Sequence, residues 1–308
     1  MASPAEITAE MPPQVHSAAD AQRLGDPIAD RHGRIMSADG TGLFYRYWPA
    51  DDRATGYAVI VLHGIGYHSG PYKVIADALN PTGIDVYGLD ARGHGLSFGP
   101  RGYVGNPAQV EADVAAMVQF VKRQQPSTRV FLLGDSMGCN YALDYAKDND
   151  DQLAGLILLA PAFYVDTSQI FNLESVLLMP YFFFAHRRPV INLVGRRLEE
   201  SSRDPEWIAA RRADPLAYKK VSFGYLLEIQ RLIAGWKRRI APRVRLSILM
   251  IKGEKDQVVS QNDCEWFERL SASTDKRFEI YPDVPHTTLW DPETPNILGL
   301  VGSWILEH

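Results

Sequence analysis

The sequence predicts an α/β fold in which helices cover both faces of a mostly parallel sheet. Short, continuous apolar runs alternate with segments of helical periodicity along much of the chain. Strands buried on both faces produce such runs, and their alternation with helices favours parallel pairing. The runs also end in glycine, acidic or histidine residues. Because chemistry in parallel sheets gathers at the carboxyl ends of the strands, we expect the functional site at that edge.

Composition limits the class of protein. The chain has 308 residues, of which 46% are hydrophobic, enough for one large domain with one insertion. Its net charge of -5 gives no basic surface for nucleic acid. Its two cysteines, Cys139 and Cys264, indicate neither a disulfide framework nor a metal site. We expect a protein that needs no cofactor and no metal.

The first part of the chain is predicted to lie outside the core. Residues 1–33 are rich in alanine, proline and aspartate and have weak periodicity, so we expect an N-terminal arm. This segment has no apolar stretch typical of a secretory signal, and no apolar run in the chain is long enough to span a bilayer. We therefore expect a cytoplasmic protein, peripheral to membranes at most.

The core elements follow in order. A hairpin is expected over residues 34–47, with its turn at Gly40–Gly42. Buried strands are expected at residues 58–62, 84–89, 130–133, 156–159, 246–251 and 277–281. Asn106 and Pro107 are predicted to start a helix, because proline is well tolerated at the first helical position. A last helix is expected over residues 295–305.

The alternation stops over residues 164–242, a stretch too long for a plain connection. We predict a lid inserted into a core made of residues 34–163 and 243–308. The lid is expected to contain an amphipathic helix whose apolar face carries Leu226, Ile229, Ile233 and Trp236.

The lid also contains an uncharged run, residues 176–185, which includes Phe182, Phe183 and Phe184. Consecutive side chains point in different directions on a helix. One reading is that the three rings pack the lid onto the core. The other is that some line an acyl tunnel while others form a rim that contacts lipid aggregates transiently.

The motif Gly134-Asp135-Ser136-Met137-Gly138 stands between an apolar run and a helical pattern. In this context G-x-S-x-G indicates a nucleophile elbow, a turn so sharp that its central residue is strained. Side chains at Gly134 and Gly138 would collide with neighbouring elements. The Ser136 hydroxyl would therefore be held clear of the backbone at a helix N-terminus, which favours negative charge.

A serine nucleophile needs a base, and in this type of fold the order is serine, acid, histidine. The histidines after Ser136 are His186, His286 and His308. His186 lies in a segment unlike a strand end, and His308 is the last residue. His286 follows the expected strand at 277–281 and is the predicted base.

The acid that orients the base should follow an earlier strand. Asp256 comes shortly after residues 246–251 and is the predicted acid, with Glu254 as the alternative. Attack by Ser136 turns a carbonyl oxygen into an oxyanion, which needs fixed donors. We expect these to be the N–H groups of Met137 and Ile65, the latter in the loop after the first central strand.

Five motifs together resemble the monoglyceride lipase and lysophospholipase branch of the α/β-hydrolases. They are His63–Gly70, Asp90–Ser97, Arg101–Val104, Gly134–Gly138 and Asp214–Leu216. The resemblance extends from about residue 34 to the C-terminus. It implies the α/β-hydrolase fold, with a mostly parallel eight-stranded sheet, helices on both faces and an inserted helical lid.

The resemblance also implies a serine ester hydrolase that acts through an acyl-enzyme on monoacylglycerol or lysophospholipid-like substrates. It points to the same triad, Ser136, Asp256 and His286, and to the same donors. The chain departs from the pattern at Cys139, where a second glycine is usual, and at Tyr67, where the animal enzymes carry an acid. Asp135 receives no catalytic role.

Two other classes of function use the same residues. An acyltransferase or a peptidase would employ the same triad on another acceptor or an amide bond. A ligand-binding protein on a hydrolase scaffold is the third hypothesis, and the intact triad argues against it. Competition between water and an added alcohol as acyl acceptor separates hydrolysis from transfer.

Overall fold

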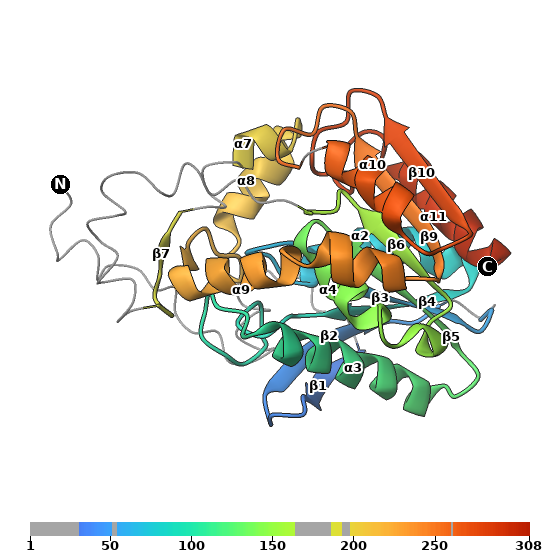
Figure 1. The fold of residues 1–308 in the computed structure, drawn as a ribbon, viewed down its shortest axis with the longest axis horizontal. Coiled ribbons are helices and arrows are strands. Elements are labelled where there is room, and N and C mark those ends of the chain that lie inside the picture. The colour runs from blue at the N-terminus through green and yellow to red at the C-terminus, as the bar shows by residue number, and fades with distance from the viewer. Residues whose placement is uncertain (1–30, 51–53, 164–185, 193–197, 260) are drawn as a thin grey trace, which may run out of the picture.

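A computed structural model describes most of the chain (Figure 1). The described residues are 31–50, 54–163, 186–192, 198–259 and 261–308. An eight-stranded sheet with the order β1-β2-β4-β3-β5-β6-β9-β10 forms the centre of the molecule. Helices pack on both of its faces (Figure 1). The predicted α/β-hydrolase architecture is confirmed.

The strands match the expected apolar runs closely. They are β1 (Arg31–Met36), β2 (Gly42–Trp48), β3 (Tyr57–Leu62), β4 (Ile84–Leu89), β5 (Arg129–Asp135), β6 (Gly155–Leu159), β9 (Ser247–Gly253) and β10 (Lys276–Tyr281). The β1–β2 and β2–β4 pairs are antiparallel, and the remaining pairs are parallel. The strand β1 begins at Arg31, so the sheet includes three residues that the sequence analysis assigned to the arm; residues 1–30 lie outside the described residues.

The core helices are α2 (Lys73–Leu79), α3 (Pro107–Gln124), α4 (Met137–Ala146), α10 (Gln261–Leu270) and α11 (Thr294–Glu307). One hydrophobic cluster joins α3, α4 and α10 to one face of the sheet, and a second joins α2 and α11 to the other. Successive side chains of β5 point to opposite faces of the sheet, so Leu132 belongs to the first cluster and Leu133 to the second. The helices α2 and α10 were not predicted.

The start of α3 has the predicted cap. The Asn106 side chain accepts a hydrogen bond from Gln109 N at 3.0 Å, and the Gln109 side chain accepts one from Asn106 N at 3.1 Å. Together with Pro107 at the first helical position, this reciprocal capping box satisfies N–H groups that the helix itself cannot pair.

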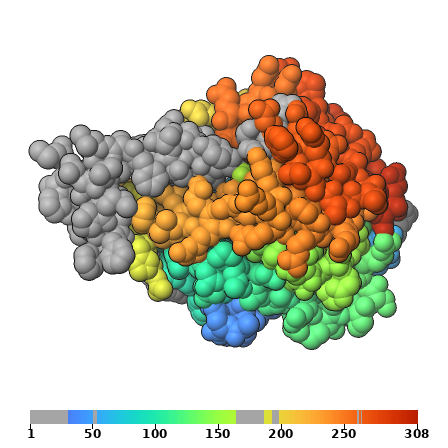
Figure 2. Space-filling view, viewed as in Figure 1, coloured from blue at the N-terminus to red at the C-terminus, as the bar shows by residue number. Residues whose placement is uncertain are grey.

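The chain between β6 and β9 contributes no strand to the large sheet in the part that the structure describes. Its elements are β7 (Pro189–Ile191), α7 (Leu198–Ser201), α8 (Pro205–Ala213), β8 (Val221–Ser222) and α9 (Phe223–Ile233), followed by a π-helical turn (Trp236–Ile240). We call residues 186–192 and 198–242 the cap segment. Figure 2 shows its later part lying across the front of the molecule, between α3 and α10.

The predicted amphipathic helix of the cap segment is α9. Its side chains Leu226, Ile229 and Ile233 are buried against the core, as expected. Trp236 is also buried, but it begins the π-helical turn and is not part of α9. The run 176–185, with Phe182 to Phe184, lies outside the described residues, so the division into arm, core and lid stays a prediction. No helix that the structure describes is long and apolar enough to cross a membrane.

Candidate active site

Ser136 lies between β5 and α4 with φ 51° and ψ -109°, a backbone conformation that residues with a side chain rarely adopt. The flanking glycines are needed, as predicted. A Cβ at Gly138 would lie 1.9 Å from the carbonyl oxygen of Leu62, and one at Gly134 would lie 2.5 Å from the Cα of Cys139. The sharp turn thus depends on close backbone packing that any larger residue would disrupt.

The structure brings Ser136, His286 and Asp256 into one chain of hydrogen bonds. Nε2 of His286 lies 2.9 Å from Oγ of Ser136. Nδ1 of His286 lies 2.9 Å from Oδ2 of Asp256. Glu254, the alternative acid, is exposed and lies beside Lys255. The three side chains come from the loops after β5, β9 and β10, where the sequence analysis expected them.

Asp256 is held in place by backbone N–H groups. Its side chain is 0% exposed, and Oδ1 accepts hydrogen bonds from Val258 N at 2.8 Å and Val259 N at 3.0 Å. Burial alone would raise the pKa of Asp256, but the charge and hydrogen bond of His286 outweigh it, so the pKa is lowered. The carboxylate is therefore ionised where it contacts the imidazole.

The His286 side chain is 12% exposed. Burial alone would lower the pKa of His286, but the charge and hydrogen bond of Asp256, helped by the charge of Asp135, outweigh it, so the pKa is raised. The two carboxylates therefore favour the protonated form of the His286 imidazole.

Of the two predicted oxyanion donors, Met137 directly follows Ser136, and Ile65 follows Gly64, which packs against Ser136. Met137 is the first residue of α4, so its N–H has no acceptor within the helix. Ile65 belongs to the loop after β3, and no described residue accepts its N–H. This loop packs against Ser136, since a Cβ at Gly64 would lie 3.6 Å from the Cβ of Ser136.

His63 shapes the loop through hydrogen bonds at both ring nitrogens. Its Nε2 accepts a hydrogen bond from Ala91 N at 3.0 Å, so Nδ1 carries the proton and donates it to the carbonyl of Gly64, 2.8 Å away. Burial lowers the pKa of His63 to about 4, so the ring is neutral near pH 7.

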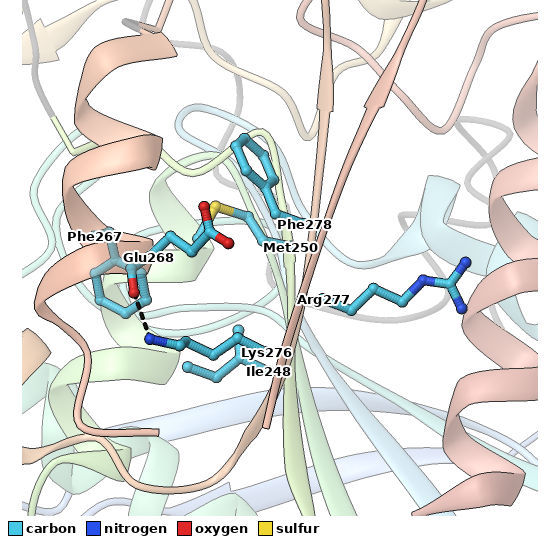
Figure 3. Close-up of a pocket in the computed structure, with 7 residues that line it drawn as sticks. All are labelled: Ile248, Met250, Phe267, Glu268, Lys276, Arg277 and Phe278. Atoms are coloured by element: carbon cyan, nitrogen blue, oxygen red, sulfur yellow. Dashed lines mark hydrogen bonds between the residues drawn. The ribbon is translucent and has the colours of Figure 1, made fainter. Parts of the chain in front are cut away.

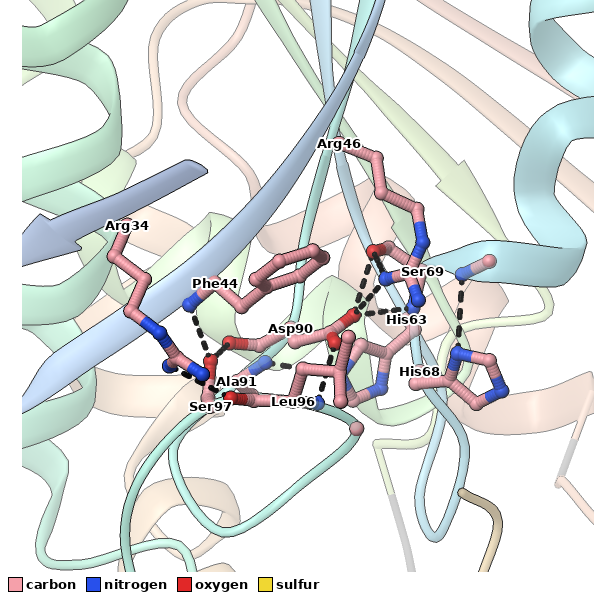
Figure 4. Close-up of polar contacts among 12 residues, drawn as sticks. Arg34, Phe44, Arg46, His63, His68, Ser69, Asp90, Ala91, Leu96 and Ser97 are labelled. Atoms are coloured by element: carbon pink, nitrogen blue, oxygen red, sulfur yellow. Dashed lines mark hydrogen bonds and ion pairs between the residues drawn. The ribbon is translucent and has the colours of Figure 1, made fainter. Parts of the chain in front are cut away.

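A buried ion pair that the sequence analysis did not predict fixes the far end of this loop (Figure 4). Oδ1 of Asp90 accepts hydrogen bonds from Arg46 Nη1 at 2.9 Å, Ser69 N at 2.7 Å and Ser69 Oγ at 2.6 Å. Oδ2 accepts one from Leu96 N at 2.8 Å. Asp90 therefore joins β2, the loop after β3 and the loop after β4.

The cap segment contacts the same loop from the other side. The carbonyl oxygen of Gly66 accepts hydrogen bonds from Arg211 Nη2 at 2.6 Å and Tyr218 N at 3.0 Å. The Arg211 guanidinium also lies 4.0 Å from the centre of the Tyr67 ring. Asp214, from the predicted Asp-Pro-Leu motif, lies 2.8 Å from Nε2 of His68.

The cap segment also reaches the loop that carries His286. Thr287 N donates to the carbonyl oxygen of Ser201 at 2.8 Å. Arg203 forms two hydrogen bonds with Asp291, at 2.7 and 2.8 Å. Neither contact was predicted, because nothing in the sequence marks these residues as partners.

A small recess between α10 and the strands β9 and β10 contains none of the predicted site residues (Figure 3). It is lined by Ile248, Met250, Phe267, Glu268, Lys276, Arg277 and Phe278. These residues lie on α10 and on β9 and β10 before their carboxyl ends, away from the loops that hold Asp256 and His286. The candidate site is therefore the edge of the sheet around Ser136.

Comparisons with known proteins identify the family of the chain. The family model Hydrolase_4, described as serine aminopeptidase, S33, matches residues 54–293. The monoacylglycerol lipase of Mycolicibacterium smegmatis is 27% identical over 270 residues, covering 87% of this chain and 94% of that protein. The monoglyceride lipase of Rattus norvegicus is 30% identical over 279 residues, covering 88% and 89%.

Solved structures show the same fold. A soluble variant of the Saccharomyces cerevisiae monoglyceride lipase, in complex with a substrate analog, has a TM-score of 0.74 at 21% identity and covers 89% of this chain and 94% of its own. A thermostable carboxyl esterase from Bacillus coagulans, in complex with glycerol, has a TM-score of 0.76 at 20% identity and covers 91% and 99%.

Proposed function

Because the chain belongs to the Hydrolase_4 (serine aminopeptidase, S33) family and is a carboxylic ester hydrolase, we propose that it works through an acyl-enzyme formed on Ser136. The observation that carries this proposal is the continuous chain of hydrogen bonds from Ser136 through His286 to Asp256. This is the arrangement that turns a serine hydroxyl into a nucleophile.

In the first half of the reaction, Oγ of Ser136 attacks the ester carbonyl and its proton passes to Nε2 of His286. The N–H groups of Ile65 and Met137 stabilise the oxyanion. The bond to the alcohol then breaks, and His286 gives its proton to the departing oxygen. Asp256 holds the ring in the required tautomer and stabilises its positive charge throughout.

In the second half, water replaces the alcohol. His286 takes a proton from the water as its oxygen attacks the acyl carbonyl, and the same two N–H groups hold the oxyanion. The bond to Oγ breaks and Ser136 recovers its proton from His286. The products are a carboxylic acid, an alcohol and the original enzyme.

We propose a single-chain lipid ester, such as a monoacylglycerol or a lysophospholipid, as the substrate. The support is the likeness to proteins named monoacylglycerol or monoglyceride lipase over nearly the whole chain. Burying each methylene of an acyl chain contributes about 0.8 kcal/mol, so the preferred chain length reports the apolar length of the acyl site.

The test is a hydrolysis screen over esters of graded chain length that includes monoacylglycerols and lysophospholipids. It is combined with labelling by a fluorophosphonate and with the variant Ser136→Ala. We expect the intact protein to carry the label on Ser136 and the variant to lose both label and turnover while keeping its thermal unfolding. Turnover that survives in Ser136→Ala would exclude the acyl-enzyme proposal.

The family description favours an aminopeptidase as the second candidate. Such an enzyme must bind a substrate ammonium, for which a carboxylate is the usual partner. The carboxylates of Asp135, Asp214 and Asp256, all beside the site, are each already hydrogen bonded. Aminoacyl anilides, assayed beside the esters, distinguish the two, and faster turnover of the anilides would reverse our choice.

A further inference from the structure

Asp135, the residue directly before Ser136, takes part in a second chain of hydrogen bonds. It is the last residue of β5, and its Oδ2 lies 2.5 Å from the hydroxyl of Tyr72. The same hydroxyl lies 3.1 Å from the backbone nitrogen of Gly64. Tyr72 is completely buried, so no water competes for these contacts.

The directions of the two hydrogen bonds are fixed by chemistry. Gly64 N–H can only donate, so the Tyr72 oxygen accepts from it and the single phenol proton points at Asp135. Burial, together with the neighbouring Asp135 carboxylate, holds the pKa of Tyr72 well above its ordinary value, so the phenol keeps that proton. The hydrogen bonds therefore connect the Asp135 carboxylate, the Tyr72 phenol and the Gly64 backbone N–H.

These hydrogen bonds end at the backbone N–H of Gly64, the residue directly before the proposed oxyanion donor Ile65. The next peptide group after Gly64 N–H carries the N–H of Ile65. A Cβ at Gly64 would lie 3.4 Å from Oδ2 of Asp135 and 3.6 Å from the Cβ of Ser136, so the loop and the nucleophile touch here. Movement of Gly64 by a fraction of an ångström would carry Ile65 N–H away from the oxyanion.

We propose that Asp135 is a positioning residue for the reaction: through Tyr72 it fixes Gly64, and with it the Ile65 donor, while its charge helps to stabilise protonated His286. The inference rests on the proposed function. It assigns a role to a residue that the sequence analysis left without one, because the partner Tyr72 lies 63 positions away and becomes visible only in the fold.

The charge around His286 supports the second half of the proposal. Burial and, to a smaller extent, Lys252 would lower the pKa of His286, but the charge and hydrogen bond of Asp256 outweigh them, and the charge of Asp135 adds to the increase. Burial raises the pKa of Asp135 itself, and Asp256 adds to that effect, whereas the Tyr72 hydrogen bond and His286 act against it. The imidazolium that forms during the reaction is thus stabilised by two carboxylates.

The variant Asp135→Asn removes the negative charge of the side chain and keeps its size and an acceptor oxygen. Its amide oxygen can still accept the Tyr72 proton, so folding should be preserved. We expect kcat on a soluble short-chain ester to fall about tenfold with KM unchanged, less than the roughly 10²–10³-fold loss on removal of a whole oxyanion donor. The acid limb of kcat/KM should move to lower pH, because His286 loses a charge that raises its pKa.

Tyr72→Phe tests the geometric half. It removes the hydroxyl and leaves Gly64 N–H and Asp135 without this partner, so kcat should fall while the acid limb does not move to lower pH. The fold-loss of kcat in the double variant, Asp135→Asn with Tyr72→Phe, should be smaller than the product of the two single fold-losses, since both residues act through the same hydrogen bond. The matched control is Asp85→Asn, a buried carboxylate at the amino-terminal end of β4, which should leave kcat and the pH profile unchanged.

The outcomes separate this inference from the proposed function. A wild-type protein whose Ser136 takes up no fluorophosphonate would overturn both. Normal labelling of Ser136, with Asp135→Asn unchanged in kcat and in its acid limb, would overturn the inference alone. A loss of kcat in Asp135→Asn that accompanies lower thermal stability, without a shift of the acid limb, would reduce Asp135 to a structural role and also overturn it.

Discussion

The loop that carries the proposed oxyanion donor Ile65 and the loop that carries the proposed base His286 meet at Ser136, but different interactions hold them. We call residues 63–70 the oxyanion loop and residues 284–291 the histidine loop. Fully buried side chains, Asp90 and Tyr72, anchor the oxyanion loop from the core. The histidine loop is anchored from the cap segment through the pair of Arg203, whose side chain is 41% exposed, and Asp291, whose side chain is 1% exposed.

This difference predicts how each loop responds to substitution. Removing one partner of a buried charge pair leaves an uncompensated charge away from water, which destabilises strongly. A pair that water can reach loses little when one partner is removed. The oxyanion loop should therefore be sensitive to changes at its anchors. The histidine loop should be sensitive mainly at the catalytic side chains themselves.

The largest expected effect is at Asp256, which contacts His286 of the histidine loop from the loop after β9. Asp256→Asn should lower kcat/KM about 10⁴-fold, because the amide no longer holds His286 in the required tautomer. Thermal unfolding should change little. The control is Glu254→Gln, a neighbouring exposed acid, which should behave as wild type in the same ester assay. The opposite ranking of the two variants would transfer the acid role to Glu254.

The next effect concerns the core anchor of the oxyanion loop. Arg46→Met leaves the Asp90 carboxylate buried with hydrogen bonds to Ser69 and Leu96 but without its ion-pair partner. The free energy of unfolding should fall by about 3–5 kcal/mol, measured by urea denaturation. Arg46→Met combined with Asp90→Asn should recover part of this loss, because the uncompensated charge is then absent. No recovery would mean that packing, and not charge, is what Arg46 supplies.

A third prediction concerns His286 of the histidine loop and uses pH in place of a substitution. His286 must be neutral to accept the proton of Ser136, and its pKa is raised. The rate of fluorophosphonate labelling should therefore increase with pH, about tenfold per pH unit below that pKa, and level off above it. The midpoint should lie on the alkaline side of the ordinary histidine value. Labelling that is flat from mildly acidic to mildly basic pH would remove His286 as the base.

The sequence predicts the sheet, and it selects the three candidate site residues, because both leave a local signal. The buried strand expected at residues 84–89 is β4, Ile84–Leu89, since parallel strands read as continuous apolar runs. Ser136, Asp256 and His286 stand at strand ends in an order that few other residues could satisfy. In these places the residue type, its spacing and its position on an element all indicate the same role.

The anchors of the two loops leave no such signal. Tyr72 and Asp135 are 63 positions apart, and Arg203 and Asp291 are 88 apart, so only the folded chain identifies them as partners. The helix α2 was missed because seven residues are too few to establish helical periodicity. What sequence reasoning lacks here is the tertiary contact, which decides how catalytic side chains are held.

The smallest expected effect is at the cap anchor of the histidine loop. Arg203→Ala removes two hydrogen bonds to Asp291. The Asp291 side chain is only 1% exposed, but it keeps a hydrogen bond from Glu293 N at 3.0 Å, and water can enter the space that the exposed guanidinium leaves. The free energy of unfolding should fall by about 1 kcal/mol or less, with a small loss of kcat. Asp291→Ala should lower the free energy of unfolding more than Arg203→Ala does, because it also removes the acceptor for Glu293 N next to the start of α11. Urea denaturation and ester turnover of both variants, compared with Arg46→Met, measure the asymmetry directly. If Arg203→Ala were as destabilising as Arg46→Met, exposure of the partner would not be what distinguishes the two loops.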